Sequence, residues 1–187
     1  MKQKLKLALV GAGERGQYCY APYAKMHGYE IEFVAVADPH KGRREKFVQD
    51  YHVPAEGVFE TAEQFFARPR MADAVLICTQ DSQHYAYACQ AIDLGYSILL
   101  EKPISPSVRE CLDLQRRAEE KGTQIMVCHV MRYTKFYRKL KELIDSGKFG
   151  APMVIKCTHR ADGVADDYTT AMAVTDTAIH EIDVLPW

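Results

Sequence analysis

Three glycines near the amino terminus have the spacing of a phosphate-binding turn. Gly11, Gly13 and Gly16 follow an apolar run at residues 5–10 and open a segment with helical spacing. In the pattern G-x-G-x-x-G the first glycine permits a tight turn, the second lets the backbone approach a pyrophosphate, and the third lets the helix pack closely on the strand. The amino end of the helix favours the phosphate charge. The alternative is a glycine-rich turn without a ligand.

An acidic residue follows at the distance that such a turn requires. Asp38 lies 22 residues after Gly16, at the end of the second apolar run. A carboxylate there accepts hydrogen bonds from the adenosine ribose hydroxyls of NAD and repels the 2′-phosphate of NADP. The alternative is an aspartate that caps the next helix, and Lys41, Arg43 and Arg44 offer positive charge for a phosphate. The pattern therefore predicts NAD as the cofactor, with NADP less favoured.

One lysine stands where a buried strand is expected to end. Lys102 lies in the tripeptide Glu101-Lys102-Pro103, directly after the apolar residues 98–100. Ligands of open α/β sheets bind beyond the carboxyl ends of the strands, and a lysine held there can transfer a proton in a reaction. The alternative is a lysine that merely reaches solvent. Lys102 is therefore a candidate acid–base group.

A second candidate pair lies near the carboxyl terminus. Asp176 and His180 have the spacing D-x-x-x-H, so on one helix they share a face. The carboxylate can then orient the imidazole for proton transfer. The alternative is that Asp176 precedes the helix as its cap. His180 also begins the zinc pattern H-E-x-x-H, but Val184 stands where the second histidine belongs, and no metal site is predicted.

These residues need a parallel sheet to bring them together. Short runs rich in Val, Ile and Leu, typical of strands buried on both faces, alternate with stretches of helical spacing. The alternation predicts an α/β fold, a Rossmann-type doubly wound parallel sheet with right-handed crossovers. Strands are expected at residues 5–10, 31–37, 57–59, 74–79, 97–101 and 124–130, and helices at residues 15–26, 41–51, 61–66, 83–94 and 108–121. Ser105 or Ser107 is expected to cap the last helix, and Gly122 to end it.

The pattern changes after Val130. A helix is expected at residues 136–145, a strand at 153–158 and an amphipathic helix at 177–187. We therefore expect a dinucleotide-binding domain at residues 1–130 and, at residues 131–187, the beginning of an α+β substrate domain. A segment of that length is marginal as an independent core, and the chain stops inside a predicted helix. The sequence thus suggests a truncated second domain.

Composition excludes several classes of function. The chain has 187 residues, 24 Lys and Arg against 25 Asp and Glu, and a net charge of −1. Without a basic surplus we expect no nucleic-acid partner. No apolar run approaches the length of a membrane-spanning helix or of a signal peptide, so no membrane association is expected. Six cysteines without a C-x-x-C pair are typical of reduced thiols in a cytoplasmic protein.

Five segments together resemble the Gfo/Idh/MocA family of NAD(P)-dependent sugar and cyclitol oxidoreductases. They are GAGERG at residues 11–16, Asp38, TQDSQH at residues 79–84, GYSILLEKPIS at residues 95–105 and DTAIHEID at residues 176–183. Residues 127–150 resemble a broad group of predicted dehydrogenases, and residues 159–187 resemble the inositol 2-dehydrogenase branch. Gln80 departs from the family pattern, because many members have proline there. Arg160 and Tyr168 lie in the part that would face a substrate.

The resemblance implies roles for individual residues. It implies that Lys102 lies beside the nicotinamide and that Asp176 and His180 complete the catalytic group. Glu101 and Thr79 would line the nicotinamide ribose. The residues expected to bind the cofactor are Gly11, Gly13, Glu14, Arg15, Gly16, Asp38, Thr79, His84, Glu101 and Lys102.

The expected function is an oxidoreductase that transfers a hydride between nicotinamide and a hydroxyl-bearing carbon of a polyol or sugar, such as an inositol-like cyclitol. Lys102 or His180 would take the hydroxyl proton. One alternative is an NAD-dependent glycosidase that acts by transient oxidation, and another is a truncated NAD-binding module without catalysis. A homo-oligomer is expected if the antiparallel sheet that family members carry after this region is present.

Overall fold

The computed structural model describes residues 3–150, 152, 154–158, 169 and 172–187. The chain divides into two compact units, Met1–Cys128 and His129–Trp187. The division falls two residues before the boundary expected from the sequence. No helix among the described residues is long and apolar enough to cross a membrane.

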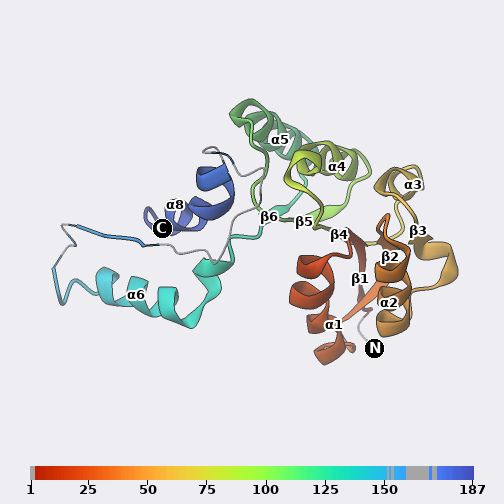
Figure 1. Cartoon of the computed structure of the whole chain (residues 1–187), viewed down its shortest axis with the longest axis horizontal. Helices are drawn as coiled ribbons and strands as arrows, with labels where there is room; N and C mark the ends of the chain where they lie inside the picture. Colours follow the sequence, from red (N-terminus) through yellow and green to blue (C-terminus); the bar gives the residue numbers. More distant parts are fainter. Residues whose placement is uncertain (1–2, 151, 153, 159–168, 170–171) are drawn as a thin grey trace. The chain divides into compact units, whose positions relative to one another are not determined.

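The first unit is built on one parallel sheet of six strands in the order β3-β2-β1-β4-β5-β6 (Figure 1). The chain order reverses between β1 and β4, which is the point where ligands bind in doubly wound sheets. The predicted α/β Rossmann-type fold is confirmed. The strands are β1 (Leu5–Val10), β2 (Ile31–Ala37), β3 (Val58–Phe59), β4 (Ala74–Ile77), β5 (Ser97–Leu100) and β6 (Ile125–Val127).

Helices cover both faces of the sheet because alternate strand residues point to opposite sides. Leu7 and Leu9 of β1 pack in one apolar cluster with Phe47 of α2, whereas Ala8 and Val10 pack in another with Ala88 of α4. The core therefore has two layers. The helices of this unit are η1 (Arg15–Tyr20), α1 (Pro22–Met26), α2 (Lys41–Tyr51), η2 (Ala55–Gly57), α3 (Ala62–Phe66), α4 (Asp81–Asp93) and α5 (Val108–Lys121).

Local signals set several helix ends as predicted. The Ser107 hydroxyl accepts a hydrogen bond from the backbone N–H of Glu110 and caps α5, which ends at Gly122 with φ of +64°. The predicted helix at residues 15–26 is instead divided into the π-helical η1 and α1. Pro22 has no N–H to donate and its ring disfavours a continuous helix, so the chain breaks there.

The second unit contains short helices. They are η3 (Val130–Tyr133), α6 (Lys135–Asp145), η4 (Ala173–Thr177) and α8 (Ile179–Val184). The helix expected at residues 136–145 is confirmed. The strand expected at residues 153–158 was wrong for its described part, since residues 154–158 form no strand. An extended segment is stabilised as a strand only by a hydrogen-bonded neighbour, and among the described residues this one has none.

Candidate functional site

The loops that carry the predicted site lie side by side at the carboxyl edge of the sheet. The backbone N–H of Gly11 donates to Ala37 O at 2.8 Å, that of Cys78 to Val10 O at 2.8 Å, and that of Glu101 to Ile77 O at 3.0 Å. The parallel ladder thus continues one residue beyond each strand. It places the glycine turn, Asp38, Thr79 and Lys102 on neighbouring loops.

The three glycines differ in the space that surrounds them. Gly11 has φ of +92°, and a Cβ there would lie 2.4 Å from Cys78 O. A Cβ on Gly16 would lie 2.4 Å from Gly11 O and 2.8 Å from Leu9 Cδ1. A Cβ on Gly13 would meet nothing nearer than Arg43 Nη1 at 3.9 Å. Gly13 therefore leaves open space beside the backbone, which fits the approach of a pyrophosphate.

The carboxylate of Asp38 is buried and is bonded to the glycine turn. Its Oδ2 accepts the backbone N–H of Ala12 at 2.8 Å, and its Oδ1 accepts that of His40 at 2.8 Å. A carboxylate offers about four acceptor positions, so it still has capacity for ribose hydroxyls. The helix that follows is capped by His40 rather than by Asp38.

The three basic residues after Asp38 are not equivalent. The buried Arg44 donates to the backbone oxygens of Asp38 at 2.7 Å and Pro39 at 3.1 Å, so its guanidinium stabilises the loop. Lys41 is exposed and pairs with Glu45 at 3.7 Å. Arg43 is the one whose guanidinium lies near the glycine turn. It is therefore the best placed of the three to meet a 2′-phosphate.

His84 joins two loops of the site. Its ring is fully buried, with Nδ1 2.6 Å from Pro103 O and Nε2 3.1 Å from Thr79 O. These contacts leave no exposed ring atom for the direct cofactor contact expected from the sequence, so we infer that His84 positions the two loops instead. Two buried side-chain atoms, Thr79 Oγ1 and Gln17 Nε2, have no hydrogen-bond partner in the described part of the chain.

Gln80 does not alter the loop after β4. It is the N-cap of α4 with φ of −75° and ψ of 148°, and it forms a capping box with Gln83. Proline adopts the same φ. The departure from the family pattern at this position is therefore compatible with the usual backbone.

Glu101 and Lys102 follow β5, and the structure adds a residue that the sequence did not indicate. The buried Glu101 carboxylate accepts the Tyr20 hydroxyl through Oε1 and the backbone N–H of Lys102 through Oε2 at 2.9 Å. Arg15 is attracted to the same carboxylate: burial lowers its pKa, yet the charge of Glu101 and contacts with Cys19 and Tyr20 raise it overall. Glu14, at the turn itself, is exposed. The sequence feature that could have indicated Tyr20 is a tyrosine about one helical turn after Gly16.

Asp176 and His180 belong to the second unit. Asp176 falls in η4 and His180 in α8, with Ala178 between these helices, so the pair does not share one continuous helix. The side chain of Asp176 lies outside the described part, as do His159, Arg160 and Tyr168 entirely. The grouping of Lys102 with Asp176 and His180 stays a prediction.

The helix that carries His180 is held by an ion pair within this unit. Asp183 Oδ2 accepts Arg132 Nε at 2.7 Å and Oδ1 accepts Arg132 Nη2 at 2.6 Å. A six-residue helix has little stability of its own, so this bidentate ion pair with η3 stabilises α8. The Arg132 guanidinium also lies 5.6 Å from the ring of Trp187.

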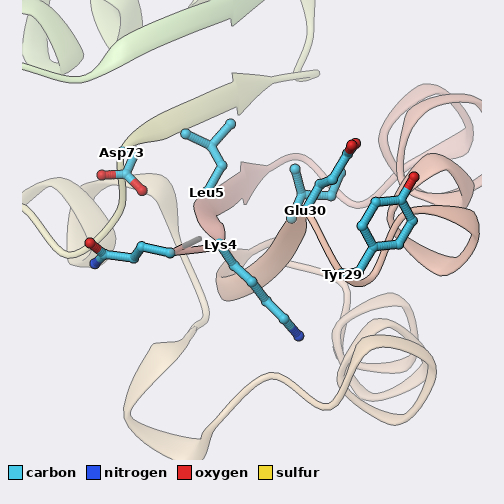
Figure 2. Close-up of a pocket in the computed structure, with 7 residues that line it drawn as sticks. Lys4, Leu5, Tyr29, Glu30 and Asp73 are labelled. Atoms are coloured by element: carbon cyan, nitrogen blue, oxygen red, sulfur yellow. The ribbon is translucent and has the colours of Figure 1, made fainter. Parts of the chain in front are cut away.

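A cavity at the opposite edge of the sheet is separate from these loops. Figure 2 shows Lys4, Leu5, Tyr29, Glu30 and Asp73 around it, at the amino ends of β1, β2 and β4. Ligands of doubly wound sheets bind at the carboxyl ends. This cavity therefore does not contribute to the candidate site.

Comparison with known proteins identifies the family. Residues 5–129 match the model described as oxidoreductase family, NAD-binding Rossmann fold, and residues 137–187 match the GFO/IDH/MocA C-terminal domain. Inositol 2-dehydrogenases of Pseudomonas savastanoi pv. phaseolicola and Klebsiella pneumoniae are 35% and 34% identical over 98% of this chain and 54% of their own.

A solved structure agrees with these relatives. The myo-inositol dehydrogenase of Lactobacillus casei, in complex with NAD(H) and myo-inositol, is 31% identical with a TM-score of 0.84 over 99% of this chain and 54% of its own. The chain thus spans about half the length of the relatives it matches. It belongs to the GFO/IDH/MocA family of oxidoreductases, whose amino-terminal unit is an NAD-binding Rossmann fold.

Proposed function

We propose that this chain supplies the cofactor-binding part of an NAD-dependent dehydrogenase that oxidises a hydroxyl of an inositol-like cyclitol or a related sugar. The likeness to a myo-inositol dehydrogenase over nearly the whole chain is the observation that carries the proposal. When bound, NAD⁺ accepts a hydride from the carbon that bears the hydroxyl. The open space at Gly13 would receive the pyrophosphate, and the Asp38 carboxylate would accept hydrogen bonds from the adenosine ribose.

The chain's own residues would remove the proton of the substrate hydroxyl. We assign the removal of the hydroxyl proton to Lys102 or His180, with Asp176 orienting the histidine. When His180 takes the proton, an ammonium group of Lys102 beside the reacting oxygen stabilises the developing alkoxide. The carboxylate of Glu101 supports this assignment, because it accepts the backbone N–H of Lys102 and so fixes where the lysine begins.

NAD is the proposed preference over NADP. The buried carboxylate of Asp38 would repel a 2′-phosphate at the adenosine ribose, and Arg44 donates to backbone oxygens. Only Arg43, among the three basic residues of this loop, lies near the glycine turn. Asp38 would therefore repel a 2′-phosphate and Arg43 would attract it. Of the two, the buried Asp38 is held more firmly in place, because backbone N–H groups bind its carboxylate.

The test is the formation of NADH, followed by absorbance, with myo-inositol and a panel of aldoses. Lys102→Met and His180→Asn should each abolish most turnover, while Lys121→Met at the exposed end of α5 serves as the matched control. Turnover that survives Lys102→Met unchanged would overturn the assignment. Hydrolysis of chromogenic glycosides without NADH accumulation would instead favour a glycosidase, and NADH binding with neither reaction would favour a binding module.

Two further expectations belong to the proposal. All six cysteines are free thiols in the structure, which supports a reducing compartment such as the cytoplasm. Assembly into a homo-oligomer, measured by light scattering, stays a prediction for the enzyme that contains the additional sheet.

A further inference from the structure

The carboxylate of Glu101 links the first helix, η1, to the backbone of Lys102. Tyr20 lies in η1, and its hydroxyl donates to Glu101 Oε1. The other oxygen, Oε2, accepts the N–H of Lys102 at 2.9 Å. Glu101 is 6% exposed, so water does not readily replace either donor. Through this carboxylate, two segments 81 residues apart are held in one arrangement.

The surroundings of Tyr20 fix the direction of this hydrogen bond. Burial, then contacts with Cys128 and Glu101, raise the pKa of Tyr20 well above its usual range, so the phenol keeps its proton and donates it. Burial likewise raises the pKa of Cys128 to about 11, which keeps its thiol neutral at the next strand end. Tyr20 is therefore a fixed donor between the ends of β5 and β6.

We propose that Tyr20 is a positioning residue for Lys102, acting through Glu101. Without the phenol, one carboxylate oxygen loses its donor and Glu101 can rotate, which releases the N–H of Lys102. The backbone position of Lys102 sets the range within which its flexible side chain can place the ammonium group. The inference rests on the proposed function, which assigns Lys102 to proton transfer.

The test compares Tyr20→Phe with Tyr18→Phe, in which a hydroxyl is removed from a 60% exposed tyrosine of the same helix. The first readout is the rate at which acetic anhydride labels Lys102 in this chain, measured by peptide mass spectrometry. The second is the dissociation constant of NADH, and the third is kcat against KM in the dehydrogenase assay.

Tyr20→Phe should change the labelling rate of Lys102 and lower kcat, by about 10- to 100-fold for a displacement near 1 Å. NADH binding should weaken less than kcat falls, because Tyr20→Phe perturbs only the Glu101 end of the expected cofactor site and leaves the glycine turn and Asp38 intact. Tyr18→Phe should match the parent. A merely structural role would lower the melting temperature of the chain without this selective loss of kcat.

Glu101→Gln provides a second route to the same question if Tyr20→Phe folds poorly. Because the two residues act in one contact, the double variant should be no worse than the more severe single variant. Additive losses, or an unchanged labelling rate of Lys102 in Tyr20→Phe, would overturn the proposal. Unchanged turnover in Lys102→Met would instead reject the assignment of Lys102, a failure that the labelling measurement distinguishes.

Discussion

Replacement of Asp38 tests whether one carboxylate both stabilises the glycine turn and selects the cofactor. Asp38→Ala removes the acceptor of the Ala12 and His40 N–H groups. Asp38→Asn keeps one acceptor oxygen and a similar shape, but it removes the charge. Asp38→Asn therefore loses the electrostatic repulsion but keeps one of the two backbone hydrogen bonds, whereas Asp38→Ala loses the repulsion and both hydrogen bonds.

The two lost hydrogen bonds are not equal in cost. Ala12 is 1% exposed, so its N–H finds no water in Asp38→Ala, whereas His40 is exposed and is readily solvated. A hydrogen bond to a charged group contributes about 1.5–3 kcal/mol. For a protein of this size, the melting temperature falls by roughly 2–4 °C per kcal/mol, so we expect a decrease of about 3–12 °C for Asp38→Ala.

Cofactor affinity should respond differently in the two variants. The parent should bind NADH more tightly than NADPH. Asp38→Asn should narrow or reverse that preference, because the 2′-phosphate no longer meets a negative charge while the ribose keeps an acceptor. Adding Arg43→Ala to Asp38→Asn should weaken NADPH binding again, since its guanidinium lies nearest to the glycine turn.

Calorimetric melting and isothermal titration with NADH and NADPH decide between these expectations. Tighter binding of NADPH by the parent would show that Arg43 rather than Asp38 controls selection. An Asp38→Ala chain that melts within about 1 °C of the parent would show that the Ala12 contact contributes little, because even a modest hydrogen bond should shift the transition by more than that.

Two other predictions concern the glycine turn and the second unit. Gly13→Ala adds a Cβ with nothing nearer than 3.9 Å, so the melting temperature should not change. The same Cβ would occupy the space of the pyrophosphate, so titration should show at least about tenfold weaker NADH binding. Gly16→Ala, whose Cβ would lie 2.4 Å from Gly11 O, should instead lower the melting temperature. Arg132→Ala removes both donors to Asp183 and should speed amide hydrogen exchange in α8, with about 1–3 kcal/mol lost. Arg132→Lys should recover only part, and equal exchange rates in both variants and the parent would contradict the role of this ion pair.

The sequence by itself determined the order of the helices and strands and the different surroundings of the three glycines. Period-two and period-3.6 patterns are local, and so are capping signals, which is why α2 and α5 have the predicted bounds. The roles of Gly11, Gly13 and Gly16 also follow from local geometry, since each depends on the strand and helix that flank the turn. Asp38 follows β2 directly, as the pattern predicts, because the end of the strand fixes its position.

The tertiary structure decided what those residues contact. The Asp38 carboxylate accepts a backbone N–H of the glycine turn, and the ring of His84 reaches two loops rather than open space. The contact of Tyr20 with Glu101 joins positions 81 residues apart. No periodicity encodes such a partner, because a side chain's neighbours across a sheet depend on strand order and on how the loops close. Residues 154–158, the described part of the strand expected at residues 153–158, form no strand for the same reason, since a strand exists only where another one is present to pair with it.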